Sequence, residues 1–497
     1  MNNKIQVFAI PTGLLFLSLF IFVKTQTTTA EDNVTNEEQP SVQNNSDIGF
    51  IMRITAQGFD YGAQLGADVL YQKLKHMNYI PDLITKQNGV EMTITNLSIV
   101  DFSPPVGNAE LIPDHGVRWI LSINHTKVSG YWNYITRAWF TFQDEGSFLA
   151  VLHETTLNIT IEITRSSYGG FVMTVSECES IINLEMNLGS WLYNIVASLA
   201  QPFLENILQS QLCDIATGII KVDAMSILEK LPVNITFQNN YVMDYSMLEP
   251  PYFTEDYMET YHKGEITWKG DKEGIPFKPM PLVPLMETDR MLYLQISDHV
   301  FNSYCYAAFS HNMLSFEVTN DNLPGNILST TCESGGLCIG RLLPKIGEQF
   351  PNESISLSVF NNLSPHWTFD DTIQLNFKGI LNFYIPQKNG RNVSIFMIDL
   401  DLKAHMSAFI KDSRLYSQIV KFTFKTINRK NSLFGENFNF YPLTNMVIKK
   451  YVIPRINDQG RLGIPLVMMS GTMVINTELK IQKHTLTLGT DFEIKHL

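Results

Sequence analysis

Long runs of alternating apolar and polar residues dominate this chain and restrict the folds open to it. These runs occupy residues 92–102, 117–132 and 157–165 in the first half, and residues 372–385, 392–406, 418–427, 471–481 and 484–494 in the second. A period of two is typical of strands that bury one face, and Gly and Pro clusters separate the runs. The pattern predicts two long antiparallel sheets, one in each half of the chain.

Apolar residues at helical spacing accompany each set of strands. In the first half they cover residues 59–74 and 191–213, and Pro202 should bend the second of these helices. In the second half, helices are expected over residues 301–310, 336–350 and 443–456. An apolar helix laid against a curved sheet closes a tube. The interior of such a tube either packs solidly or encloses an elongated apolar cavity, and both readings fit the pattern.

The remaining segments divide the chain. Residues 1–30 hold an apolar stretch behind Lys4 and are expected to be a signal peptide, with an uncleaved signal anchor as the alternative. Residues 31–47 are polar and acidic and are predicted to be a disordered tail. Residues 263–289 contain four prolines within nine positions and are predicted to be a linker between folded parts at 48–262 and 290–497.

Glycosylation motifs and cysteines both fit a secreted, extracellular protein. Nine Asn-x-Ser/Thr sequons are candidate glycosylation sites: Asn33, Asn44, Asn96, Asn124, Asn158, Asn234, Asn352, Asn362 and Asn392. The five cysteines are Cys178, Cys213, Cys305, Cys332 and Cys338. In an oxidising compartment, one or two disulfides with one odd thiol are expected.

Charge and motifs exclude several functions. Charged residues make up 17% of the chain, the net charge is −13, and no basic block occurs, so nucleic-acid binding is not expected. The sequence HETTL at His153 lacks the second His of a zinc-protease helix, and the sequence around Ser334 lacks the first Gly of GxSxG. The prediction is a protein that is not an enzyme and has no metal and no cofactor.

Four motifs resemble one known family. The first is residues 49–75, with Arg53, Ile54, Gly58, Asp60 and Tyr61 at the entry to the first helix. The others are the pair Cys178 and Cys213, the segment 290–304 after the Pro-rich linker, and the segment 452–466. In this order they resemble the family of bactericidal/permeability-increasing protein, lipopolysaccharide-binding protein, phospholipid transfer protein and cholesteryl ester transfer protein.

The resemblance implies an α+β fold. The expected shape is an elongated boomerang of two tubular antiparallel β-barrels, each wrapped around amphipathic helices and joined by a central sheet and the linker. It also implies a Cys178–Cys213 disulfide and an apolar pocket in each barrel that holds a bound phospholipid. The candidate lipid-binding residues are Phe59, Leu65, Val69, Leu70, Trp191, Ile195, Leu199, Phe203, Val447 and Tyr451.

The loop at residues 129–140 corresponds to the tip of the N-terminal barrel in the family. Its candidate membrane-contacting residues are Tyr131, Trp132, Tyr134, Arg137 and Trp139. Aromatic side chains suit a bilayer or lipoprotein interface, although the same rings could instead pack at a strand turn. Because Arg137 is the one basic residue of the loop, strong pairing with lipid A phosphates is not expected.

Three functional hypotheses follow. The first is a secreted, monomeric carrier of phospholipid or another amphipathic lipid that exchanges it with a membrane or lipoprotein surface. The second is innate immune binding of bacterial lipopolysaccharide with an antibacterial or signalling outcome. The third is a structural extracellular glycoprotein that keeps an immobile lipid in its core.

Overall fold

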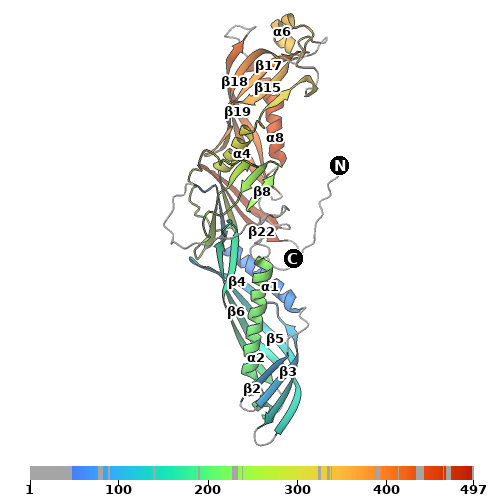
Figure 1. The fold of residues 1–497 in the computed structure, drawn as a ribbon, viewed down its shortest axis with the longest axis vertical. Coiled ribbons are helices and arrows are strands. Elements are labelled where there is room, and N and C mark those ends of the chain that lie inside the picture. The colour runs from blue at the N-terminus through green and yellow to red at the C-terminus, as the bar shows by residue number, and fades with distance from the viewer. Residues whose placement is uncertain are drawn as a thin grey trace.

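The computed structural model describes residues 47–75, 82–87, 90–137, 141–187, 191–225, 233–237, 239–322, 326–332, 336, 338–387, 392–411, 414–431, 441–462, 464–465 and 472–494. Figure 1 shows an elongated molecule with one curled sheet at each end and a third sheet between them. The expected signal peptide and almost all of the expected acidic tail lie outside the described residues.

The N-terminal curled sheet has the strand order β2-β3-β5-β6-β7, and β3 and β4 share one edge of β5. Its strands are β2 (Leu83–Gln87), β3 (Val90–Phe102), β4 (Val106–Ile112), β5 (Gly116–Arg137), β6 (Thr141–Arg165) and β7 (Phe171–Asn187). Register shifts interrupt the β3–β5 and β6–β7 pairings. Such bulges bend a strand and increase its twist, which helps so long a sheet to curl.

Two helices pack on this sheet: α1 (Ala56–Lys75) and α2 (Trp191–Gly218), which continues as a π-helical segment, η1 (Ile219–Ala224). The helix therefore extends past Cys213, where the apolar stripe in the sequence ends, and Pro202 lies within it. Strand β4 approaches α1 so closely that a Cβ on Gly107 would collide with the carbonyl oxygen of Ala63. Glycine is therefore required at this crossing.

The C-terminal curled sheet has the order β14-β15-β17-β18-β19-β20, with β16 paired to β17. The strands are β14 (Phe316–Val318), β15 (Ser356–Asn361), β16 (His366–Phe369), β17 (Ile373–Pro386), β18 (Asn392–Lys411), β19 (Arg414–Asn431) and β20 (Ile464–Pro465). The helical segments of this end are η2 (Asn320–Asn322), α5 (Ile339–Leu342), α6 (Pro344–Gln349), α7 (Tyr441–Val447), the π-helical η3 (Ile448–Val452) and α8 (Ile453–Leu462). Pro344 separates α5 from α6 because proline fits the first turn of a helix but not its interior.

The sheet between the two ends draws strands from the whole chain. Its order is β10-β11-β1-β13-β22-β21, and all of its pairings are antiparallel. The strands are β1 (Phe50–Thr55), β10 (Tyr252–Phe253), β11 (Tyr257–His262), β13 (Leu292–Ser297), β21 (Thr472–Gln482) and β22 (Thr485–Ile494). The signature strand β1 thus lies between β11 and β13, which are about 200 residues away in sequence.

A small sheet and one helix flank this central sheet. The small sheet contains β8 (Asn234–Phe237), β9 (Tyr241–Asp244) and β12 (Glu265–Trp268), and α4 (Asp298–Ser310) follows β13. Strand β12 lies inside the segment predicted to be a linker, whereas residues 269–289 form no helix or strand. The predicted α+β fold of two curled antiparallel sheets joined by a central sheet is confirmed.

Candidate functional site

The interior of the N-terminal curled sheet is apolar. On α2, Leu204 and Leu208 are buried, with Ile207 and Leu212 packed beside them. Their partners from the inner face of the sheet are Met92, Ile94, Leu97, Val128, Trp132, Phe148, Ala150, Leu152, Ile182 and Leu184. The side chains of the candidates Trp191, Ile195, Leu199 and Phe203, earlier on the same helix, lie outside what the structure describes. The described part of α2 therefore buries its apolar stripe in this interior.

Polar contacts fasten α2 to strand β7, the last strand of the sheet. Gln201 donates from Nε2 to the carbonyl oxygen of Leu184 at 2.7 Å, and Glu205 Oε1 accepts from the Leu184 backbone N–H at 3.4 Å. Gln201 also donates to Glu205 at 3.1 Å. An edge strand leaves backbone groups without a neighbouring strand, and these two side chains partner one such residue. The sequence pattern missed them, although two polar residues at i and i+4 in an apolar helix were a usable signal.

The Cys178–Cys213 disulfide joins the same two elements further along. It links β7 to α2 across 35 residues of sequence, and it is the pairing that the resemblance implied. The edge of β7 is thus attached to α2 by a covalent bond at one point and by hydrogen bonds at another. The line along which α2 and β7 meet is called the α2–β7 seam below.

The candidates on α1 lie in a packed core. Phe59 and Leu70 are 3% and 1% exposed and pack with inner-face residues of β5 and β6 and with β1 of the central sheet. Val69 is buried and Leu65 is half-buried. Trp119 donates from its indole N–H to the carbonyl oxygen of Ala63 at 3.2 Å, which ties β5 to α1. This core connects the N-terminal curled sheet to the central sheet.

A small apolar cavity lies in the C-terminal curled sheet. Its lining includes both candidates from this half, Val447 and Tyr451. The other lining residues, which were not among the lipid-binding candidates, are Val318, Ile327, Leu328, Ile339, Leu357 and Met446. The cavity volume is about 10 Å³, roughly what one water molecule requires. Tyr451 belongs to the π-helical η3, so this segment forms part of the cavity wall.

The prediction of a tip loop at residues 129–140 is wrong for residues 129–137, which form part of a strand. Residues 129–137 continue strand β5 and pair with β6, because their alternating pattern extends the strand beyond residue 132. Trp132 is 6% exposed and packs in the interior of the sheet, and Tyr134 packs beside it, whereas Tyr131 is 57% exposed. Neighbouring residues of a strand face opposite sides, which explains this division. Trp139 and the side chain of Arg137 lie outside the described residues.

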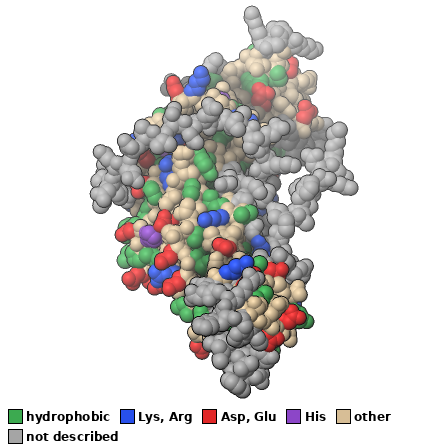
Figure 2. All heavy atoms as spheres, turned by 60° about the horizontal axis from the view of Figure 1, so that its bottom comes forward, with side chains coloured by type: hydrophobic (Ala, Val, Ile, Leu, Met, Phe, Trp, Pro, Cys, Tyr) green, Lys and Arg blue, Asp and Glu red, His purple; other side chains and the backbone are tan. Residues whose placement is uncertain are grey.

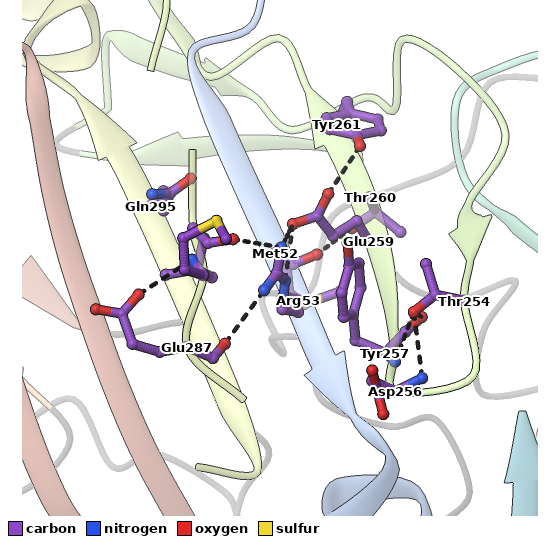
Figure 3. A network of polar contacts seen from close by, with 12 residues as sticks. Met52, Arg53, Thr254, Asp256, Tyr257, Glu259, Thr260, Tyr261, Glu287 and Gln295 are labelled. Carbon is purple, nitrogen blue, oxygen red and sulfur yellow. Dashed lines mark hydrogen bonds and ion pairs between the residues drawn. The ribbon is translucent and has the colours of Figure 1, made fainter. Parts of the chain in front are cut away.

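A buried ionic network holds the linker on the central sheet (Figure 3). Arg53 of β1 donates from Nε to Glu259 Oε1 at 2.8 Å, and its guanidinium lies 3.7 Å from the ring centroid of Tyr257. It also donates to the backbone carbonyl oxygens of Leu285 and Glu287, at 3.0 and 3.1 Å. The Arg-Ile pair of the N-terminal motif therefore has a structural role, since its arginine binds residues 285–287 to the sheet.

His262 is buried beside this network. Its Nδ1 lies 2.7 Å from the carbonyl oxygen of Tyr245, which can only accept, so Nδ1 carries the proton. Nε2 lies 2.8 Å from Thr260 Oγ1 and accepts from that hydroxyl. Burial lowers the pKa of His262 to about 4, because the charged imidazolium loses its hydration.

Acidification is expected to destabilise the fold through His262. The unfolded chain binds a proton near pH 6.5, whereas folded His262 stays neutral until about pH 4. Between these values the unfolded state binds more protons, so stability falls as pH falls, by about 3 kcal/mol over the whole window. Urea denaturation between pH 7 and pH 4 measures this slope. The variant H262Q should reduce this slope, and an unchanged slope in a folded H262Q variant would contradict its assignment to His262.

The remaining cysteines and sequons can also be placed. Cys332 and Cys338 form a second disulfide, and Cys305 is a buried free thiol whose pKa burial raises to about 12. Six candidate sequon residues are exposed: Asn96, Asn124, Asn234, Asn352, Asn362 and Asn392. Asn158 is half-buried, and Asn33 and Asn44 lie outside the described residues.

The described part of the chain offers neither a cluster of metal ligands nor a membrane-spanning helix. Within it, no three His, Cys, Asp or Glu side chains come together in a way that could hold a metal ion. None of its helices combines the length and apolar character needed to cross a membrane.

Comparison with known proteins matches both halves of the chain. The model of the C-terminal domain of the LBP / BPI / CETP family matches residues 236–494, and that of the N-terminal domain matches residues 58–230. The chain is 25% identical over 462 residues to bactericidal permeability-increasing protein from Sebastes schlegelii, covering 90% of this chain and 95% of that one. It is 23% identical over 467 residues to lipopolysaccharide-binding protein from Bos taurus, covering 89% and 93%. A crystal structure of lipopolysaccharide binding protein matches with a TM-score of 0.59 at 19% identity, covering 90% of this chain and all of that one.

Proposed function

The chain belongs to the LBP / BPI / CETP family, and from that premise we propose that it is a secreted glycoprotein that carries phospholipid or a similar amphipathic lipid. The family consists of lipid-binding proteins rather than enzymes. In this proposal, acyl chains enter the apolar interiors of the curled sheets, and the protein exchanges its lipid with a membrane or lipoprotein surface.

The apolar interior between α2 and the N-terminal curled sheet carries this proposal. Burial of each CH₂ group contributes about 0.8 kcal/mol, so a dozen such groups would hold a lipid tightly. The α2–β7 seam supplies a route by which acyl chains could enter this interior. It is closed by side-chain hydrogen bonds from Gln201 and Glu205, and not by a ladder of backbone hydrogen bonds between two strands. Opening these bonds would let acyl chains pass without breaking the sheet.

The C-terminal cavity supports a second site of the same kind. At about 10 Å³ it is far smaller than an acyl chain, so loading would require the cavity wall to move. The wall includes the π-helical η3, and π-helical turns are often found at functional positions in helices. We therefore infer that η3, and not the strands behind it, moves when lipid enters the cavity.

Charge favours the carrier over recognition of bacterial lipopolysaccharide. Residues 48–262 hold 23 Asp and Glu against 10 Lys and Arg. Figure 2 turns this end toward the reader and shows acidic side chains spread over its described surface. Clustered Arg and Lys side chains favour the binding of anionic phosphate groups, whereas an acidic barrel repels these groups. The lipopolysaccharide hypothesis therefore ranks second. Because some relatives are named for lipopolysaccharide binding, the experiment below also tests this hypothesis.

Native mass spectrometry of the secreted, deglycosylated protein tests this proposal. The expected result is one or two co-purifying phospholipids per chain, identified after extraction. The variant L208W replaces the leucine side chain with a larger indole ring in the interior beside α2. It should therefore reduce the lipid content. V222W, at an exposed position of η1, is the matched control and should not. Thermal unfolding of both variants separates loss of lipid from loss of fold.

Other outcomes would contradict the carrier. A chain that is lipid-free and takes up no fluorescent phosphatidylcholine would favour the structural glycoprotein. Retention of lipopolysaccharide in place of phospholipid would favour immune recognition. Full lipid content in a folded L208W variant would move the site away from the N-terminal interior.

A further inference from the structure

The outer face of the C-terminal curled sheet carries a compact group of lysines. In the β18–β19 register, Lys403 lies opposite Thr423, and Lys421 and Lys425 lie two residues to either side of Thr423. Diagonal neighbours across antiparallel strands are about 7–8 Å apart. All three lysines are exposed, whereas the alternate residues Leu402 and Ala404 are buried on the inner face. Three positive charges therefore point to the same side of the sheet.

The rest of this face keeps a positive excess. Lys378 of β17 and Lys411 of β18 are exposed and occupy the same side. The acidic residues of this face are Asp399 and Asp401, and Asp401 lies 4.0 Å from Lys378. Among the described side chains of these three strands, five lysines thus share this side with two aspartates.

Exposed apolar side chains stand among these lysines. Ile427 is 69% exposed and Val420 is 61% exposed on β19, close to Lys425 and Lys421 in sequence. Phe409 is 47% exposed and stacks on Tyr416 at a centroid distance of 5.4 Å, nearer the hairpin turn. Basic residues combined with exposed aliphatic and aromatic ones are typical of surfaces that bind at a membrane interface. The basic apolar face is defined here as Lys378, Lys403, Lys411, Lys421 and Lys425 together with Phe409, Tyr416, Val420 and Ile427.

The two ends of the molecule differ in charge. Residues 290–497 contain 20 Lys and Arg against 16 Asp and Glu, the reverse of the acidic excess in residues 48–262. At physiological salt, charges are screened over about 8 Å. A 22-residue strand such as β5 spans roughly 70 Å, so the acidic end is beyond the reach of the basic apolar face. Local charge therefore decides what binds at each end.

We propose that the basic apolar face docks the protein on an anionic lipid bilayer, with the acidic N-terminal barrel directed away from it. The lysines would meet anionic headgroups, while Val420, Ile427 and Phe409 would reach the boundary between headgroups and acyl chains. A sulfated polysaccharide would use the lysines but leave these apolar side chains in water, so the lipid surface fits the whole face better. This proposal does not depend on lipid inside the barrels.

Vesicle co-sedimentation of the full secreted protein tests the proposal. The wild-type protein should bind phosphatidylcholine vesicles that contain phosphatidylserine, and should not bind vesicles of phosphatidylcholine alone. Each lysine near an anionic leaflet contributes about a factor of five, so K403Q/K421Q/K425Q should weaken binding by about 100-fold. K75Q/K86Q/K127Q removes the same charge from the N-terminal barrel and should keep wild-type binding. V420S/I427S should weaken binding while retaining the lysines.

Several results would overturn the proposal. These are no binding of the wild-type protein to anionic vesicles, equal losses in the two lysine triples, or heparin binding without vesicle binding. Native mass spectrometry of the same variants distinguishes docking on a bilayer from the carrier function. The K403Q/K421Q/K425Q variant should keep any co-purifying lipid, because its substitutions lie on the outer face.

Discussion

Replacing Arg53 by methionine is expected to lower the free energy of unfolding by about 3–5 kcal/mol, the usual cost of breaking a buried ion pair from one side. The guanidinium is 4% exposed and makes a salt bridge of 2.6 Å with Glu259, which would stay buried without its partner. The substitution also removes the donors that bind the carbonyl oxygens of Leu285 and Glu287. Urea denaturation at neutral pH measures the loss.

A second salt bridge to the same linker provides a matched control. Lys480 forms an exposed salt bridge with Glu287 at 2.7 Å, and exposed pairs contribute about 1 kcal/mol or less. K480M should therefore have a small effect. An R53M variant that unfolds within about 1 kcal/mol of the wild type would show that residues 285–287 are held without the network.

Removing the Cys178–Cys213 disulfide should cost about 4 kcal/mol, because the bond closes a long loop in the unfolded chain. The double variant C178S/C213S should also free the α2–β7 seam, leaving the Gln201 and Glu205 contacts to hold it. We therefore expect faster lipid exchange at temperatures where the variant is still folded. Denaturation under non-reducing conditions and transfer of a fluorescent phospholipid measure the two effects.

The second disulfide provides the comparison for this prediction. Cys332 and Cys338 are six residues apart, and so short a loop gives an expected loss of about 2 kcal/mol. C332S/C338S lies away from the seam and should not change lipid exchange. Equal effects of the two double variants would contradict a special role for the bond between β7 and α2.

Local sequence patterns predicted the strands and helices well, because period and amphipathicity act over neighbouring residues. They placed β18 and most of β5, but they identified only residues 157–165 of the longer strand β6. The pattern did not reveal the central sheet, since β1 meets β11 and β13 only through contacts about 200 residues apart. That arrangement followed from the family resemblance instead.

The candidate site was only partly predictable for the same reason. Val447 and Tyr451 were named from the sequence and line the C-terminal cavity. Trp132 was assigned to a membrane-contacting loop but faces the interior, because β5 continues past the expected turn. Gln201 and Glu205 were missed because their partner, the backbone of Leu184, lies on another element, although their i and i+4 spacing in an apolar helix was a usable signal.

The central sheet also determines when this protein can finish folding. Strand β1 is synthesised early, but its neighbour β13 pairs on its other side with β22, which ends at Ile494. The Ile494 backbone N–H also donates to the hydroxyl of Tyr61 in the first helix, across 433 residues. Translation at about 5–20 residues per second would therefore leave β1 without its complete sheet for roughly 20–90 s. Until the last strand emerges, the edge of the incomplete sheet would be open to mispairing, so the nascent chain should depend on chaperones that bind exposed strand edges.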